Sequence, residues 1–134
     1  NINAALGVAQ LEKLQWFLAR KREIFMKYKD INILDGLKLA DVPPYADNNH
    51  WMNILQVDKN TFGKDRDTLM AELAEYNIQT RTAWSLIHKL KPYNHCQNYK
   101  IEKAEELVKN SLCLPSSTNL TDDDLDYVLS RLNL

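Results

Sequence analysis

The first 28 residues carry apolar side chains at the spacing of an α-helix. One stripe of this predicted helix holds Leu11, Leu14, Leu18 and Phe25, and it is flanked by Trp16, Phe17, Ile24 and Tyr28. Most of the charged residues fall on the remaining faces. Because the apolar arc is wide, we predict one long helix over residues 2–28 that packs on two sides. One side would face its own domain, and the other a further domain or a second subunit.

Glycine and proline residues interrupt regular secondary structure in the segment that follows. Residues 29–48 predict a connecting loop, since Gly36 and the Pro43–Pro44 pair interrupt any regular element. Residues 50–57 alternate partly between apolar and polar positions and end in a turn-rich break, which predicts a strand.

A helix is predicted from Asp65 to Tyr76, and its inward positions are Leu69, Met70, Leu73 and Tyr76. Asn77 stands at its exit, where a left-handed backbone conformation suits Asn or Gly. Residues 78–84 then alternate and predict a second strand.

The last third of the chain predicts a helix, a strand and a helix. The first helix covers residues 101–110, and the strand covers residues 111–115, where proline stops it. The final helix begins at Thr121, a hydroxyl N-cap, and three aspartates in its first turn face the positive end of the helix dipole. Its core stripe consists of Leu125, Val128, Leu129 and Leu132.

Three short strands among helices predict an α+β fold in two layers, with the helices covering one face of the sheet. The chain has 134 residues and is 45% hydrophobic, which suffices for one domain with a single core. Its 17 basic and 18 acidic residues leave a formal charge of -1, so it lacks the clustered positive charge that binding to nucleic acid or an anionic membrane requires. Cys96 and Cys113 lack a C-x-x-C spacing and are interpreted as thiols of a cytoplasmic protein.

Several residues are of types found in metal sites or catalytic sites, but their spacing does not support such a role. His50, His88 and His95 lack metal-ligand spacing with carboxylates or thiols, and Cys96 is not aimed at the ring of His95 merely by following it. The aspartates at 122–124 lack the spacing of a calcium loop, and helix capping accounts for them. We therefore expect no metal site.

Arg81, Trp84 and His88 leave real alternatives open. On an alternating strand Arg81 is either a solvated arginine or a guanidinium that grips a carboxylate or phosphate bidentately. Trp84 is either a core or interface residue or a flat wall of a ligand site. His88 lies either at the same rim or on an ordinary surface, and spacing does not decide between the two.

Three segments together resemble the DegT/DnrJ/StrS family of pyridoxal-phosphate sugar aminotransferases, in order and spacing over essentially the whole chain. "NINAALGVAQLEKL" (1–14) with "ARKREIFMKY" (19–28) resembles the helix that follows the active-site lysine region. "RDTLMAELAEYNIQTRTAWSLIHKLKPY" (66–93) resembles the tract of a helix, G-I-x-T-R, a histidine and Pro-x-Tyr. "AEELVKNSLCLPSSTNLTDDDLDYVLSRL" (104–132) resembles the closing A-E-x-L, S-L-P and L-T pattern. Asn77 departs from the usual glycine, a change that Asn tolerates.

The resemblance implies the C-terminal small domain of a fold-type I enzyme, cut just before its long helix. The chain begins without methionine and inside a helical pattern, which agrees with that reading, although a processed or engineered N-terminus would look the same. The lysine that carries pyridoxal phosphate and most of the cofactor-binding groups would belong to a large domain upstream. We therefore expect no catalytic or cofactor-binding residue in residues 1–134, and no activity of the chain alone.

The resemblance also implies substrates and partners for the whole enzyme. The enzyme would be a cytoplasmic homodimer that transfers an amino group from glutamate to a nucleotide-linked 4-keto-6-deoxy sugar in surface polysaccharide or glycan biosynthesis. The "WSLIHKL" wording (84–90) is most similar to enzymes that act on UDP-linked amino sugars. The substrate-binding residues implied here are His50, Arg81, Trp84 and His88. The alternative is a non-enzymatic α+β module that associates through the exposed apolar side of the long helix.

Overall fold

A four-stranded antiparallel sheet forms the centre of the molecule. The computed structural model describes residues 1–132, apart from the side chain of Asn32. The strand order is β1-β2-β4-β3, with bounds Leu37–Leu39 for β1, Asn53–Val57 for β2, Ser111–Leu114 for β4 and Arg81–Thr82 for β3. Every adjacent pair is antiparallel. The predicted α+β class is confirmed, whereas the predicted number of strands is wrong by one.

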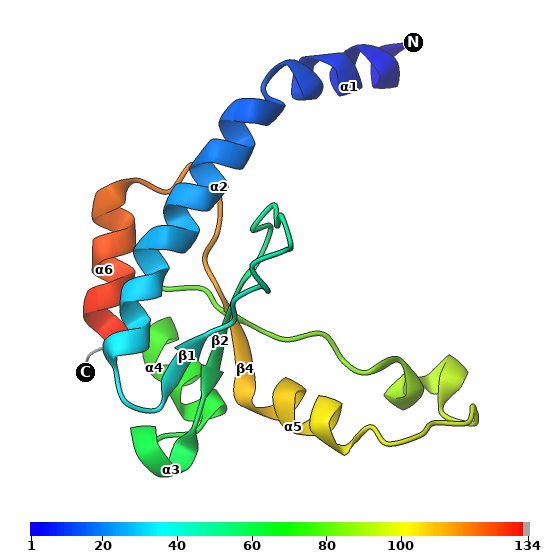
Figure 1. Cartoon of the computed structure of the whole chain (residues 1–134), viewed down its shortest axis with the longest axis vertical. Coiled ribbons are helices and arrows are strands. Elements are labelled where there is room, and N and C mark those ends of the chain that lie inside the picture. Colours follow the sequence, from blue (N-terminus) through cyan, green and yellow to red (C-terminus); the bar gives the residue numbers. More distant parts are fainter. Residues whose placement is uncertain (133–134) are drawn as a thin grey trace.

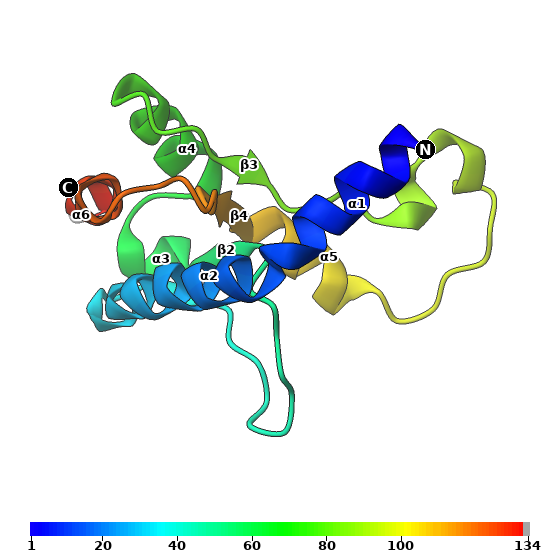
Figure 2. The same cartoon turned by 90° about the horizontal axis from the view of Figure 1, so that it is seen from above.

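The helices distribute unequally over the two faces of the sheet. In chain order they are α1 (Ile2–Glu12), α2 (Leu14–Tyr28), α3 (Lys59–Phe62), α4 (Arg66–Glu75), α5 (Glu102–Asn110) and α6 (Asp122–Leu132). Figure 2 shows α2, α4 and α6 gathered on one side and α5 on the other. Short 3-10 helices follow α2 at Lys29–Ile33 and precede α5 at Ile87–Lys89 and Lys91–Tyr93.

The core lies between one face of the sheet and the helices α2, α4 and α6. Alternate strand residues point into it because successive side chains of a strand face opposite sides. The sheet contributes Leu37, Leu39, Leu55, Val57, Leu112 and Leu114, and the helices contribute Ile24, Phe25, Tyr28, Leu69, Leu73, Leu125, Val128 and Leu132. The predicted inward positions of the helix beginning after Thr121 are thus confirmed, with Leu129 packed at the margin. Each fully buried aliphatic side chain stabilises the fold by about 1.5–3 kcal/mol.

The predicted single N-terminal helix is two helices. The break falls at Lys13, whose backbone N–H donates to the Gln10 carbonyl at 3.1 Å, a 3-10 contact within the α-helical path. Figure 1 shows α1 leaving the direction of α2 there and projecting away from the body. None of the α1 residues is buried, whereas the C-terminal half of α2 buries Ile24, Phe25 and Tyr28. Only that half of the predicted stripe packs on this domain.

The segment 29–48, predicted as a loop, contains strand β1. Its three residues pair with β2 in the register Leu37↔Val57, Lys38↔Gln56 and Leu39↔Leu55. Three alternating residues beside a glycine carry too little periodicity to distinguish a strand from a turn. The pairing depends on Gly36, which has φ +81° and whose carbonyl accepts from the Asp58 N–H at 2.8 Å.

The predicted strand at 78–84 shrinks to Arg81–Thr82 because the preceding residues complete the end of α4. Asn77 has φ +60°, as its position predicts. Its N–H donates to the Ala74 carbonyl at 3.0 Å, and the Ile78 N–H donates to the Leu73 carbonyl at 2.9 Å. These two bonds form a Schellman cap, in which buried Ile78 makes the apolar closure against the helix.

The predicted strand at 50–57 is shorter in the structure, where it begins at Asn53 and the backbone of His50 is left-handed rather than extended. His50 has φ +48°, its side chain is buried, and its ring stacks on Phe25 of α2 with the ring centroids 4.1 Å apart. Burial is the main reason that its pKa is lowered from 6.5, and the positive charge of Arg22 acts in the same direction. His50 therefore anchors the start of β2 onto α2.

Two glycines give a matched test of backbone strain. Gly36→Ala should strongly destabilise the fold, because a Cβ there would lie 2.7 Å from the Phe62 Cβ and closer still to the Phe62 backbone nitrogen. Gly63→Ala has a similar φ of +85° but open space around the added atom, so it should cost only about 1–2 kcal/mol of unfolding free energy. Urea denaturation of the 134-residue chain measures both, and equal losses would contradict the packing of α3 on Gly36.

The buried imidazole of His50 predicts a pH dependence of stability. Because its folded-state pKa is lowered, the unfolded chain binds the proton more readily, and stability falls as pH drops below 6.5. The variant His50→Asn tolerates the positive φ and does not titrate in this range. Its urea midpoint should therefore change less between about pH 8 and about pH 5 than that of the unaltered chain. His95→Asn, at an exposed position, controls for loss of an imidazole. If the urea midpoint of His50→Asn changed with pH as much as that of the unaltered chain, His50 would not be the cause of the pH dependence.

Candidate functional site

A groove runs along the β3 edge of the sheet, where the ends of β2, β3 and β4 meet. It has a volume of about 720 Å³. The segments before β2 and after β4 contribute one wall of its lining, which consists of Trp51, Met52, Pro115 and Ser116. The remaining lining residues are Met70, Gln79, Arg81, Thr82, Trp84, Cys113 and Leu114. Two of the four residues predicted to bind substrate, Arg81 and Trp84, therefore line one cavity.

Arg81 is the one charged side chain among the lining residues described for this groove. It lies on an edge strand, exposed, and in register with Cys113 of β4. Among the described side chains of residues 1–132, no carboxylate forms an ion pair with it. A guanidinium left in this state is available to an anionic ligand, which it can hold through two parallel hydrogen bonds.

Two indoles form the aromatic part of the groove. The rings of Trp51 and Trp84 lie 5.6 Å apart between centroids and are tilted by 55°. They are 60% and 69% exposed, so neither contributes to the core. Exposed tryptophans in contact with each other are suited to packing against a ring of a ligand or a partner.

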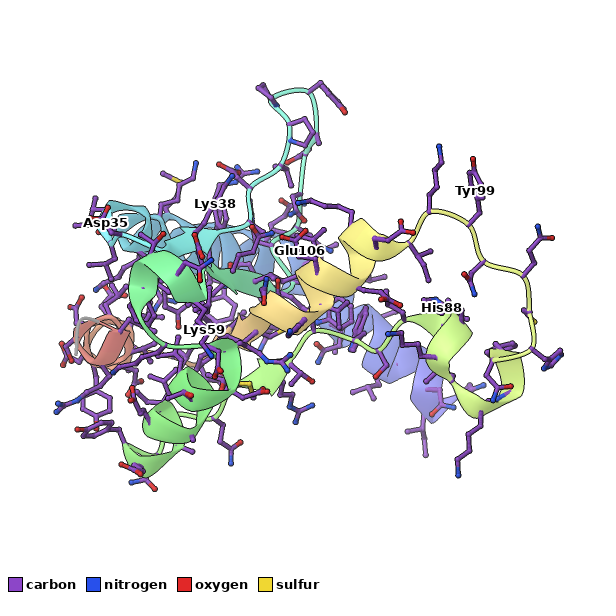
Figure 3. The ribbon with its side chains drawn as sticks, turned by 90° about the horizontal axis from the view of Figure 1, so that it is seen from below. Asp35, Lys38, Lys59, His88, Tyr99 and Glu106 are labelled. Atoms are coloured by element: carbon purple, nitrogen blue, oxygen red, sulfur yellow. The ribbon has the colours of Figure 1, made fainter. Side chains whose placement is uncertain are left out.

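The other two predicted residues lie elsewhere. His50 directly precedes Trp51 in the sequence, but its side chain is buried and stacks on Phe25. Its ring therefore serves as an anchor in this structure. His88 lies on the segment that leaves the sheet after β3 and extends past α5, as Figure 3 shows. Its Nε2 is 3.6 Å from Glu105 Oε1, and it lines a separate hollow of about 510 Å³ with Tyr93 and Cys96. The structure does not bring the four residues together within the described chain.

Sequence reasoning missed the residues that hold one wall of the groove in place. The Lys21 ammonium on α2 donates to the Trp51 carbonyl at 3.2 Å, to the Ser116 carbonyl and to Ser116 Oγ at 3.3 Å. Ser116 Oγ in turn donates to the Trp51 carbonyl at 2.9 Å. Burial lowers the pKa of Lys21. Sequence alone gave no signal, because Lys21 is one of several charges on a helix, and its partners lie 30 and 95 positions away.

This arrangement is suited to binding rather than to proton transfer. A positive guanidinium beside two indoles complements a ligand with an anionic group next to a ring. Burial raises the pKa of the Cys113 thiol, which keeps the sulfur protonated and weakly nucleophilic. No lysine is among the lining residues of the groove, and Lys21 beside it is held by three oxygens. The lining of this groove therefore offers no free lysine amine, the group to which pyridoxal phosphate attaches.

Two negative findings apply to the described residues. None of their helices has both the length and the apolar character needed to cross a bilayer. Their histidine, cysteine and acidic side chains do not gather in groups of three or more that could hold a metal ion.

Curated relatives match nearly the whole chain. EpsN of Bacillus subtilis, whose name assigns it a pyridoxal phosphate-dependent aminotransferase activity, is 34% identical over 98% of this chain. GDP-perosamine synthase of Escherichia coli O157:H7 is 31% identical over 99% of it. The matched region is 34% and 35% of these two proteins, so the chain spans about one third of the length of the relatives it matches.

Solved structures agree with the fold. The structure of DesI in the presence of its TDP-sugar product superposes with a TM-score of 0.87 and 30% identity, covering 96% of this chain and 33% of DesI. The aminotransferase TlmJ from Streptoalloteichus hindustanus superposes with a TM-score of 0.84 and 25% identity, covering 96% of this chain and 34% of TlmJ. The model of the DegT/DnrJ/EryC1/StrS aminotransferase family matches residues 1–133. The chain therefore belongs to the DegT/DnrJ/EryC1/StrS aminotransferase family.

Proposed function

We propose that this chain is the C-terminal domain of an enzyme that transfers an amino group from glutamate to a nucleotide-linked 4-keto-6-deoxy sugar, in the biosynthesis of a surface polysaccharide or glycan. The observation that carries the proposal is the likeness to DesI, at 30% identity over 96% of the chain, whose structure was solved in the presence of its TDP-sugar product. The name GDP-perosamine synthase, at 31% identity, points to the same class of reaction.

The groove would form part of the substrate wall in that enzyme. Arg81 would hold the anionic part of the nucleotide sugar or of the amino donor, and the pair Trp51 and Trp84 would pack against its rings. His88 and His50 stay in the proposal in different ways. His88 lies on the segment after β3 and could meet substrate in the whole enzyme, whereas His50 supports the wall from beneath through its stack on Phe25.

The cofactor would be held by parts of the enzyme outside residues 1–134. Pyridoxal phosphate supplies the electron sink for amino transfer, and the protein supplies binding and orientation. The groove contributes a cation and two aromatic rings but no lysine among its lining residues, which supports this division of roles. Exposed Cys96 and buried Cys113 are free thiols, as suits the cytoplasm.

The bare N-terminal helix would pack against the remainder of the enzyme and its second subunit. Ile2, Leu6, Val8 and Leu11 of α1 are all more than half exposed, as is Trp16 near the start of α2. A helix with apolar side chains on several faces is usually covered by a partner surface. In a homodimeric enzyme this surface would be covered.

The exposed apolar side chains of α1 also support a second candidate function, a non-enzymatic module that associates through α1. The coding sequence upstream of Asn1 distinguishes the two candidates. A large α/β domain with a lysine shortly before "NINAALG" supports the enzyme, and a start codon there supports the module.

Cofactor binding by the isolated chain gives the first test. We expect no stable, stoichiometric coloured adduct when the 134-residue chain is incubated with pyridoxal phosphate and separated from free cofactor, because the proposed lysine lies elsewhere. Absorbance spectroscopy measures this, with the protein made from the full coding sequence as the positive control. A coloured one-to-one adduct on the isolated chain would overturn the proposed division of roles.

Arg81 gives the second test, in the enzyme made from its full coding sequence. Arg81→Lys keeps the charge but loses the bidentate fork, so the KM for the anionic substrate should rise roughly ten- to hundredfold. Arg22→Lys is the matched control, because Arg22 is an exposed arginine that pairs with Asp47 and is not among the lining residues of the groove. Steady-state kinetics with both substrates varied measures the change, and equal KM values in the two variants would refute a substrate contact by Arg81.

A further inference from the structure

The wall of the groove that carries Trp51 is attached to the domain by few contacts. Trp51 precedes β2 by two residues and is mostly exposed, so burial does not fix its position. Its N–H donates to Asn49 Oδ1 at 3.0 Å, a contact within the same loop. Within residues 1–132, the hydrogen bonds that tie Trp51 to other elements both end on its carbonyl, from Lys21 Nζ at 3.2 Å and from Ser116 Oγ at 2.9 Å.

Helix α2 therefore holds this wall at two successive residues. Lys21 and Phe25 are four positions apart, which places them one turn apart on one face of the helix. Phe25 stacks on His50, and Lys21 bonds to the carbonyl of Trp51, the next residue. Lys21 also bonds to Ser116, so a single ammonium joins the segment before β2 to the segment after β4.

Lys21 itself is suited to this task. Its ammonium has three hydrogens, and three oxygens accept from it. Unlike Lys27 on the same helix, which pairs with the Asp126 carboxylate, Lys21 has no carboxylate partner among the ion pairs of the described residues. Its charge is directed at backbone and hydroxyl oxygens that shape the groove.

We propose that Lys21 is a positioning residue for the substrate groove, where its ammonium holds the backbone of Trp51 and so keeps the two indoles in the contact that forms the aromatic part of the groove for the nucleotide sugar. The expected effect on substrate binding rests on the proposed function of the groove, whereas the expected effect on the position of Trp51 does not. Without the ammonium, the hydrogen bond from Ser116 is the one that still ties Trp51 to another element among the described residues, so we expect Trp51 to move relative to Trp84 and Arg81. Lys21 touches no substrate and acts through Trp51.

The first experiment measures the indole pair in the 134-residue chain without any substrate. Exciton-coupled circular dichroism reports the mutual orientation of Trp51 and Trp84, and Trp84→Phe identifies their share of the signal. Lys21→Met should lose most of that share, and Lys21→Arg, which keeps the charge and donors, should recover part of it. Lys27→Met is the matched control, because Lys27 is a part-buried lysine on the same helix that bonds to Asp126 and the Asp122 carbonyl instead.

Ser116→Ala keeps the test decisive if Lys21→Met does not fold. It removes the second donor to the Trp51 carbonyl and should reduce the same signal in the same direction. A full signal in both Lys21→Met and Ser116→Ala, or an equal loss in Lys27→Met, would overturn the positioning role.

The second experiment measures kinetics in the enzyme made from its full coding sequence. Lys21→Met should raise the KM for the nucleotide sugar roughly tenfold with a smaller change in kcat, Lys21→Arg should restore it in part, and Lys27→Met should leave it unchanged. If Arg81→Lys raises this KM while Lys21→Met does not, the positioning role is refuted and the proposed function stands. If neither variant changes it although the indole signal is lost in Lys21→Met, the proposed role of the groove fails.

Discussion

The fold depends on how the C-terminal half of α2 lies across the sheet. Ile24, Phe25 and Tyr28 bury their side chains in the core, and the Tyr28 hydroxyl donates to the Pro115 carbonyl at 2.9 Å. Burying each of these side chains stabilises the fold by about 1.5–3 kcal/mol. The exposed ion pairs of the same helix contribute less, about 0–1 kcal/mol each. Once α2 is seated, its Lys21 and Phe25 meet the segments that border the groove. The same helix face thus holds the core together and shapes the candidate site.

The two ends of the N-terminal stretch differ in how far they are buried. The half that ends at Tyr28 is buried, while α1 exposes its apolar side chains and bends away at Lys13. An apolar helix without a partner is stable only where a further surface covers it, because isolated short helices are marginal in water. This property agrees with a chain that spans about one third of its relatives' length. The groove and α1 both leave aromatic or apolar side chains exposed.

The candidate site shows what sequence order can and cannot supply. The resemblance to the family implied a substrate role for Arg81 and Trp84, and in the structure both line one groove. His88, four residues further on, diverges because the chain leaves the sheet after Thr82. His50 was expected at the substrate wall, whereas its positive φ and its stack on Phe25 make it an anchor.

Local chemistry by itself determined the α+β class, the Asn77 cap, the Thr121 cap and the core stripe of α6, since each depends on residues within one or two helical turns. The tertiary structure alone decided the rest. Strand β1 exists through its pairing with β2, and Trp51 joins the groove through a lysine 30 positions earlier. The physical reason is that a local pattern encodes φ, ψ and which face is apolar, whereas the contact between distant segments depends on how whole elements pack.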